Sequence, residues 1–239
     1  MSGYLKWMKN TVWACLFGGM LALPISAVSQ AEIQTSYYKS YTYEKMANYP
    51  DASKALSAVY AAYPKSYTVN LRLAYLYFQS GYYANALNHY ETAILAIPDA
   101  IDPKLGKMWV LMRKEKYEEA ASLGYQVLKL DYMNYYANLR LAYILRLQKK
   151  YELAEKVNLK LLALHPTDVL FLTEYGALQY DMGNLEKAAV IFQDVLILDP
   201  ENVDSRAFLD QLKRIGRATQ STPAKKTSAH KKTPNATKK

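Results

Sequence analysis

Few side chains in this sequence have the types and the spacing that catalysis or metal binding requires. The three histidines, His89, His165 and His230, lie far apart, without cysteines or carboxylates beside them at the spacing of metal ligands. The only cysteine, Cys15, lies in an apolar segment near the start of the chain. Neither a glycine-rich phosphate loop nor a serine nucleophile elbow is present. We therefore expect no catalytic residue, no metal site and no cofactor.

The sequence gives stronger evidence for a partner-binding surface of aromatic and arginine side chains than for a catalytic or metal site. We call Tyr41, Tyr75, Trp109 and Tyr143 the aromatic series, because successive members are thirty-four residues apart. The same face of the predicted helices also carries Phe78, Met112, Arg146 and Tyr180, with Arg72 and Arg140 one step aside. Aromatic rings offer a large contact area at low entropy cost, and arginine pairs with carboxylates. Such a surface suits an extended peptide or a partner helix, although an aromatic series can equally pack against a neighbouring helix.

The elements that position these residues repeat with the same period. The string Asn-Leu-Arg-Leu-Ala-Tyr occurs at residues 70–75 and again at 138–143. Three further series keep this register: Ala52, Ala86, Ala120, Ala154 and Ala188; Tyr49, Tyr83, Tyr117 and Tyr151, with Leu185 in the fifth place; and Pro64, Pro98, Pro166 and Pro200. Gly81 and Gly183 would allow tight turns between paired helices. Helix pairs of this kind cannot bury their apolar faces alone, so they must stack into a solenoid.

One unit carries almost the full signature of a known repeat. It places Leu73, Ala74, Tyr77, Ala86, Tyr90, Ala93 and Pro98 in order. The sequence therefore resembles the tetratricopeptide repeat family over about 170 residues. The resemblance implies an all-α superhelix of helix-turn-helix repeats, with the aromatic series facing a concave groove that binds peptides. Four residues depart from the family pattern, and weaker local packing is expected around them: Met108, Tyr132, Gly124 and Asn158.

The period divides the chain into units. We predict full repeats at residues 67–100, 101–134, 135–168 and 169–202, after a degenerate repeat at 32–66. A capping helix at 203–216 would cover the last repeat with Ala207, Phe208 and Leu212. Residues 217–239 lack aromatic residues and acids, and this composition predicts a disordered basic tail.

The first thirty-one residues have the layout of a secretory signal peptide. Lys6 and Lys9 precede an apolar centre at residues 12–23, then Pro24, and then Ser29-Gln30-Ala31. This layout predicts cleavage after Ala31 and a periplasmic protein without cysteine. The alternative is an uncleaved anchor that holds the protein at the inner membrane, facing the periplasm.

The net charge of +9 comes from one end of the chain, because nine basic residues and no acidic ones lie between Lys213 and Lys239. The tail lysines form three pairs: Lys225 and Lys226, Lys231 and Lys232, Lys238 and Lys239. They could bind an anionic envelope polymer or membrane surface, or serve only solubility. Nucleic acid is not an expected partner, because no aromatic residue in the tail could stack on bases.

These features together predict a non-catalytic adaptor or assembly factor of the bacterial cell envelope, which binds a protein or peptide. Its groove would use Tyr41, Arg72, Tyr75, Phe78, Trp109, Met112, Arg140, Tyr143 and Arg146. The alternative is an envelope tether, in which the tail or the anchor holds the protein to an anionic surface and the repeats act as a spacer. The sequence leaves the partner and the oligomeric state open.

Overall fold

The computed structural model describes residues 28–221, which form helices joined by short turns. The predicted all-α fold is confirmed. The apolar centre of the predicted signal peptide and all six tail lysines lie outside the described residues. The helices are α1 (Gln30–Lys45), α2 (Tyr49–Lys54), α3 (Ser57–Ala62), α4 (Tyr67–Gln79), α5 (Tyr83–Ala96), α6 (Ile101–Arg113), α7 (Tyr117–Leu130), α8 (Tyr135–Leu147), α9 (Tyr151–Leu162), α10 (Val169–Asp181), α11 (Leu185–Leu198) and α12 (Val203–Ser221).

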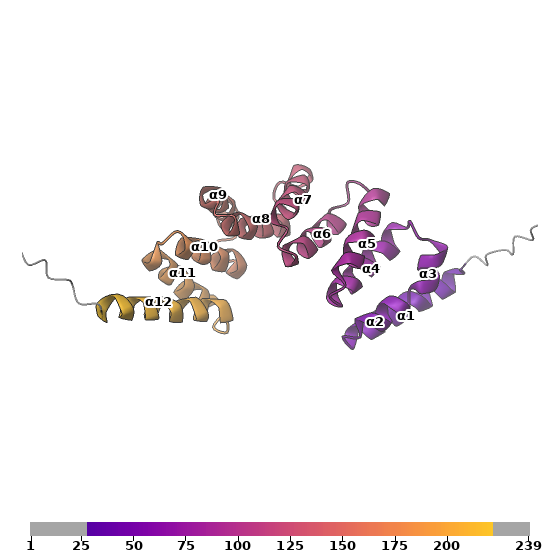
Figure 1. The fold of residues 1–239 in the computed structure, drawn as a ribbon, viewed down its shortest axis with the longest axis horizontal. Coiled ribbons are helices and arrows are strands. Elements are labelled where there is room, and N and C mark those ends of the chain that lie inside the picture. The colour runs from indigo at the N-terminus through magenta and orange to yellow at the C-terminus, as the bar shows by residue number, and fades with distance from the viewer. Residues whose placement is uncertain (1–27, 222–239) are drawn as a thin grey trace, which may run out of the picture.

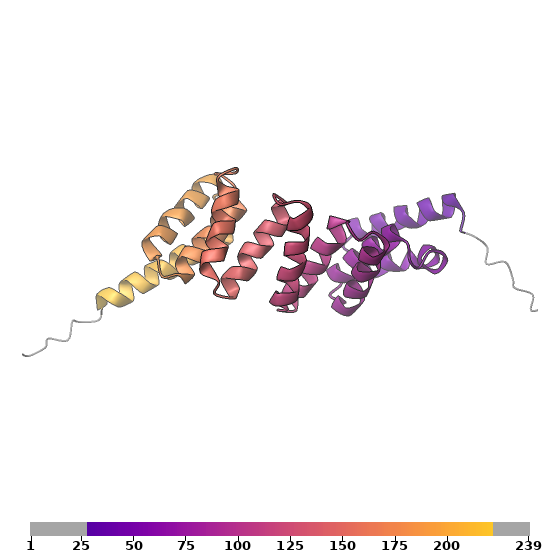
Figure 2. The same cartoon turned by 90° about the horizontal axis from the view of Figure 1, so that it is seen from above.

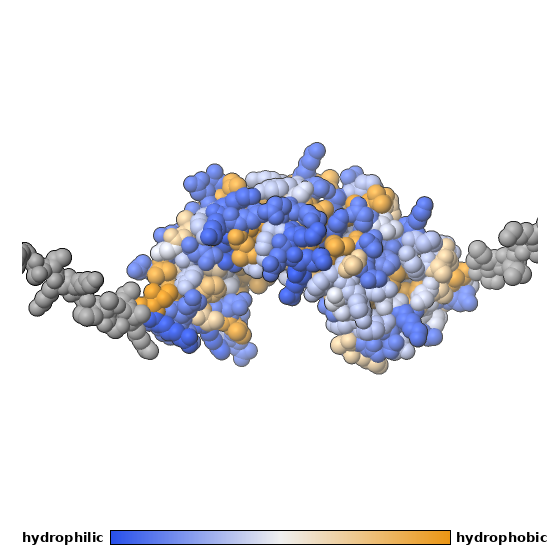
Figure 3. All heavy atoms as spheres, viewed as in Figure 1, coloured by the Kyte–Doolittle hydropathy of each residue, from blue (hydrophilic) through white to orange (hydrophobic). Residues whose placement is uncertain are grey.

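Consecutive helices pair as antiparallel hairpins, and the hairpins stack side by side into an arch (Figures 1 and 2). We call α1, α4, α6, α8 and α10 the inner helices, and their partners the outer helices. In Figure 1, α7 and α9 lie on the outer side of the arch, with α6 and α8 beneath them. The space-filling view shows the hollow on the underside of this arch (Figure 3).

The repeated alanines explain how closely the two helices of each pair approach. Ala52, Ala86, Ala120, Ala154 and Ala188 are all fully buried. The repeated tyrosines and Leu185 begin the outer helices: α2, α5, α7, α9 and α11 each start at one of them. A side chain larger than a methyl group at the alanine positions would push the paired helices apart.

Every turn between an inner and an outer helix contains one residue in the left-handed conformation. Gly81 and Gly183 have φ values of 78° and 83°, as their residue type predicts. Ala47, Glu115 and Lys149 occupy the same place in the other repeats, with φ between 56° and 58°. The stacking of the repeats therefore imposes the turn even where the residue type disfavours it.

Two of the three departures in the second repeat, Met108 and Gly124, compensate each other. In the first repeat, small Ala74 packs beside the large ring of Tyr90 in one buried cluster. The second repeat reverses the sizes, because a Cβ atom on Gly124 would lie 3.0 Å from Met108 Cε. Met108 thus fills the space that Gly124 leaves, and it is fully buried. The volume is conserved across the helix pair, so this repeat keeps its packing.

A recurring hydrogen bond holds the loop between repeats. The amide of Asn70 donates to the carbonyl oxygen of Pro64 at 2.9 Å, and that of Asn138 donates to the carbonyl of Tyr132 at 3.2 Å. Lys104 and Arg206 make the equivalent bonds to Pro98 and Pro200. Because the bond uses the carbonyl oxygen, tyrosine can replace proline at position 132.

The first helix of the solenoid is polar on the side where a further repeat would pack, and α12 covers the last repeat. Where α4 buries Val69, Leu73 and Leu76, α1 has Thr35, Lys39 and Thr42 at the equivalent positions, none of them buried. At the other end, α12 packs Phe208, Leu209 and Leu212 against the last repeat. A polar face such as that of α1 is typical of a terminal repeat.

Two expectations about the capping helix need correction. It continues to Ser221, so the predicted boundary at residue 216 lies within the helix. Ala207 is exposed, and the fully buried Ser205 takes a place against the last repeat instead. The buried side follows the 3.6-residue helical period from Ser205 through Phe208 and Leu209 to Leu212.

Candidate peptide-binding groove

A groove of about 680 Å³ lies between the inner helices α6, α8 and α10 and the capping helix α12. Most of its lining is apolar. It is lined by Trp109, Met112, Arg113, Tyr136, Leu139, Arg140, Tyr143, Arg146, Leu170, Thr173, Glu174, Ala177, Asp204 and Phe208. A concave, mostly apolar surface with a few charged groups is typical of a ligand site.

The groove contains five of the nine residues that the sequence predicts for it: Trp109, Met112, Arg140, Tyr143 and Arg146. The other four, Tyr41, Arg72, Tyr75 and Phe78, lie on α1 and α4 and do not line it, although the Phe78 ring centre lies 6.4 Å from that of Trp109. The aromatic series is thus divided into two parts with different surroundings.

Arg72 is already fully paired within the N-terminal part. Its Nη1 atom lies 2.5 Å from Glu44 Oε2, and its Nε and Nη2 atoms donate to Ser40 Oγ at 3.3 and 3.2 Å. The guanidinium also lies 3.9 Å from the centre of the Tyr41 ring, and only 9% of Arg72 is exposed. These contacts join α1 to α4 and leave Arg72 little capacity for a ligand.

Arg146 is likewise paired, although it lines the groove. It donates to Glu174 at 2.7 and 3.2 Å and to Asp181 at 2.8 Å. Burial alone would lower the pKa of Arg146, but the two carboxylates raise it above its ordinary value. Burial raises the pKa of Glu174 and outweighs the opposing effect of Arg146. This network fixes the Arg146 guanidinium 5.3 Å from the centre of the Tyr143 ring.

Arg140 has no such partner. Its Nη1 atom donates to the carbonyl oxygen of Leu105 at 2.5 Å, and its guanidinium lies 4.8 Å from the Trp109 ring centre and 5.8 Å from that of Tyr136. Within residues 28–221, no carboxylate forms an ion pair with it. Burial lowers the pKa of Arg140, so its charge is poorly solvated. An anionic group of a ligand would replace the stabilisation of this positive charge that is lost when burial removes water.

Two further residues give the groove its charge distribution. Arg113 lies 5.9 Å from the Trp109 ring centre and has no carboxylate partner in the described part of the chain. Asp204 lies on α12, at the opposite side of the groove from α6. Two arginines that form no ion pair with any described residue thus lie beside Trp109, of which 36% is exposed.

The sequence did not predict the other nine lining residues, among them Phe208 and Asp204 on the capping helix. Phe208 stacks on Phe192, with ring centres 4.6 Å apart, and contacts Tyr180 at 5.4 Å. It therefore covers the last repeat, as predicted, and also lines the groove. Their thirty-four-residue equivalents on the preceding inner helix, Leu170 and Glu174, line the groove too. Phe208 lies two periods after Arg140, which the sequence does predict in the groove, so this spacing could have identified Phe208.

Residues 28–221 offer neither a metal site nor a membrane-spanning helix. No group of three or more His, Cys, Asp or Glu side chains in that range is placed to hold a metal ion. No helix in the same range is both long and apolar enough to cross a bilayer.

Comparison with known families decides the classification. The profile of the tetratricopeptide repeat matches residues 39–103 and 105–169, which together make up more than half of the chain. The chain belongs to the tetratricopeptide repeat family. A sequence comparison with curated proteins finds no significant match.

Solved tetratricopeptide repeat structures share the fold at low sequence identity. A tetratricopeptide repeat protein from Parabacteroides merdae ATCC 43184 is 18% identical, with a TM-score of 0.71 over 80% of this chain and 76% of that one. PilW, described as a type IV pilus biogenesis factor, is 19% identical, with a TM-score of 0.69 over 80% and 89% of the two chains. YrrB, described as having an unusual peptide-binding site, is 19% identical, with a TM-score of 0.55 over 69% and 85%.

The tetratricopeptide repeat fold is a typical non-catalytic scaffold for protein interactions. In this member, the groove between α6 and α12 combines an aromatic and aliphatic lining with two arginines that form no ion pair within residues 28–221. That combination can bind apolar side chains and carboxylates together.

Proposed function

We propose that this protein is an adaptor that binds an acidic segment of a partner protein in the groove between α6 and α12. The observation that carries the proposal is Arg140, a half-buried guanidinium that lies 4.8 Å from the Trp109 ring centre without a carboxylate partner in the described residues. A partly desolvated charge without an opposite charge is unfavourable, so a ligand carboxylate would bind there with favourable free energy. Apolar side chains beside that carboxylate would cover Trp109 and Tyr143.

The charges also bear on where the ligand comes from. Residues 1–27 and 222–239 contain no Asp or Glu side chain, and they include eight lysines. Those segments would be repelled by Arg113 and Arg140. The ligand is therefore a segment of another protein.

Trp109 provides a direct assay. With Trp7 and Trp13 changed to Phe, it is the only tryptophan, and its fluorescence reports binding beside Arg140. The probe is a synthetic peptide with alternating Glu and Phe, compared with the same peptide carrying Gln in place of Glu. We expect the acidic peptide to change the fluorescence saturably and to bind more tightly than the Gln peptide.

Arg140→Met keeps most of the side-chain volume and removes the charge. A hydrogen bond to a charged group contributes about 1.5–3 kcal/mol, so affinity for the acidic peptide should fall roughly ten- to 150-fold. Arg214→Met, on the same protein but outside the groove lining, is the matched control and should bind as the unchanged protein does. Equal affinities of the acidic and Gln peptides, or undiminished binding by Arg140→Met, would refute the proposal.

We further propose that the protein is exported to the periplasm, on the support of the basic, apolar and small-residue layout of residues 1–31. Mass spectrometry of the protein purified from cell envelopes would show whether the chain starts at Glu32. An intact N-terminus would favour the anchored alternative. Removal of residues 217–239 tests the tail: an adaptor keeps its partner without it, whereas a tether loses its location.

A further inference from the structure

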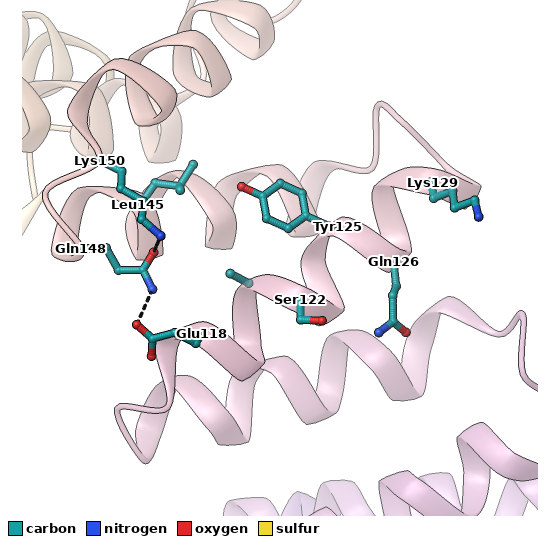
Figure 4. Close-up of a pocket in the computed structure, with 9 residues that line it drawn as sticks. Glu118, Ser122, Tyr125, Gln126, Lys129, Leu145, Gln148 and Lys150 are labelled. Carbon is teal, nitrogen blue, oxygen red and sulfur yellow. Dashed lines mark hydrogen bonds between the residues drawn. The ribbon is translucent and has the colours of Figure 1, made fainter.

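A second cavity, which we call the outer pocket, lies on the outer side of the arch between α7 and the turn that joins α8 to α9 (Figure 4). Its volume is about 520 Å³. Ala121 and Leu145 form an apolar floor, and Tyr125, of which 51% is exposed, forms a wall. None of these residues belongs to the groove.

The repeat pattern explains why the space is open here. Position 121 corresponds to Leu87 in the preceding repeat and to Glu155 in the following one. Leu87 packs against the core cluster that contains Leu111. Glu155 accepts hydrogen bonds from Tyr175 and Gln179, both at 3.1 Å. Ala121 has neither the volume of leucine nor the reach of glutamate, so the junction between the second and third repeats stays unfilled.

The polar residues at the rim give the outer pocket its charge. Gln148 donates to Glu118 at 3.1 Å and accepts from Lys150 at 2.9 Å (Figure 4). Gln148 is thus hydrogen-bonded to both Glu118 and Lys150. Lys150 makes no ion pair with a carboxylate in the described residues. Lys129, at the other end of the pocket, makes none there either. The rim therefore carries two lysines for one carboxylate.

We propose that the outer pocket is a second docking site, which takes one leucine-sized or larger apolar side chain from an acidic segment of another protein. The apolar side chain would lie on Ala121 and Leu145 against the Tyr125 ring. Carboxylates on either side of it would pair with Lys129 and Lys150. The volume falls within the usual range of about 300–1,000 Å³ for ligand pockets.

The segments of this chain outside the structure do not fit this description. Residues 222–239 contain no large apolar side chain, and neither they nor residues 1–27 contain an acid. The two lysines would repel both segments. Charge complementarity therefore assigns the outer pocket to an acidic partner rather than to the chain itself.

The test uses the full chain and amide chemical shifts measured by nuclear magnetic resonance. The probe is acetyl-Glu-Leu-Glu-amide, with acetyl-Glu-Ala-Glu-amide and acetyl-Lys-Leu-Lys-amide as comparisons. We expect saturable shifts at Ala121, Tyr125 and Leu145 with the first peptide. Each comparison peptide should bind several-fold more weakly, because one lacks the apolar side chain and the other reverses the charge.

Ala121→Leu fills the pocket with the side chain that the preceding repeat carries at this position, so the protein should remain folded. Its affinity for acetyl-Glu-Leu-Glu-amide at this site should fall roughly tenfold or more. Ala84→Leu, an exposed position on outer helix α5, is the matched control and should leave the shifts unchanged. Absence of saturable shifts at the pocket, or shifts that persist in Ala121→Leu, would overturn the proposal. Arg140→Met leaves this site intact, so failure of the groove proposal is distinguishable from failure of this one.

Discussion

Replacing Gly106 with alanine tests how the inner helices pack against the outer helix of the preceding repeat. Gly106 lies on α6 at the position that Arg72 and Arg140 occupy in neighbouring repeats. A Cβ atom there would overlap the Tyr90 ring of α5, with the hydroxyl oxygen only 2.5 Å away. Tyr90 is 4% exposed, so its ring has little space into which to move.

Two opposing effects set the size of the change. Alanine in the middle of a helix is more favourable than glycine by about 0.5–1 kcal/mol. Forcing an extra methyl group into a well-packed core costs about 1–3 kcal/mol. Since the ring cannot retreat, we expect Gly106→Ala to lower the free energy of unfolding by about 1–2 kcal/mol.

Gly124→Ala is the matched control, because it makes the same change on another helix. Its new Cβ would lie 3.0 Å from Met108 Cε, the flexible end of an unbranched side chain. Met108 can move by a few tenths of an ångström, so the helix preference should dominate. We expect no loss of stability, or a gain of up to about 1 kcal/mol.

Urea unfolding followed by circular dichroism measures both variants, and the Tyr90→Ala background separates the two effects. In that background the overlap is gone, so Gly106→Ala should become stabilising. The reasoning is refuted if Gly106→Ala is at least as stable as the unchanged protein, or if removing the Tyr90 ring leaves its effect the same.

Three other predictions concern stability. Burial lowers the pKa of His89, so the unfolded chain takes up a proton first and the free energy of unfolding should fall as pH drops below about 6.5; His89→Gln should lose this dependence in urea titrations at several pH values. Arg146→Met leaves Glu174 buried without its cation and should cost about 3 kcal/mol, most of which Glu174→Met in the same chain should restore. Lys149→Gly removes the steric cost of a side chain in the left-handed conformation, which exceeds the entropic cost of glycine. The free energy of unfolding should therefore rise by about 0.5–1 kcal/mol, measured as a higher melting temperature.

Much of the fold follows from the period of thirty-four residues. The alanine series predicts where paired helices approach, and all five alanines are fully buried. The turns could have been located from Gly81 and Gly183 alone, because adding or subtracting the period gives Ala47, Glu115 and Lys149. Burial and turns repeat in this way because each helix pair solves the same local packing problem.

The departures from the pattern needed the structure. Met108 and Gly124, read one at a time, indicate weak packing, whereas together they keep the volume of the helix pair constant. A sequence scored against a family pattern position by position cannot show that two exceptions lie in contact.

The sequence by itself determined the helical repeats, their turns and the face on which the aromatic series lies. Only the tertiary structure decided which part of that series lines a groove. Arg72 and Arg140 occupy the same place in their repeats, yet Glu44 pairs with Arg72 and no carboxylate in the described residues pairs with Arg140. The physical reason is that a helix period fixes only the direction of a side chain, whereas its free charge depends on which groups the neighbouring repeats place within reach.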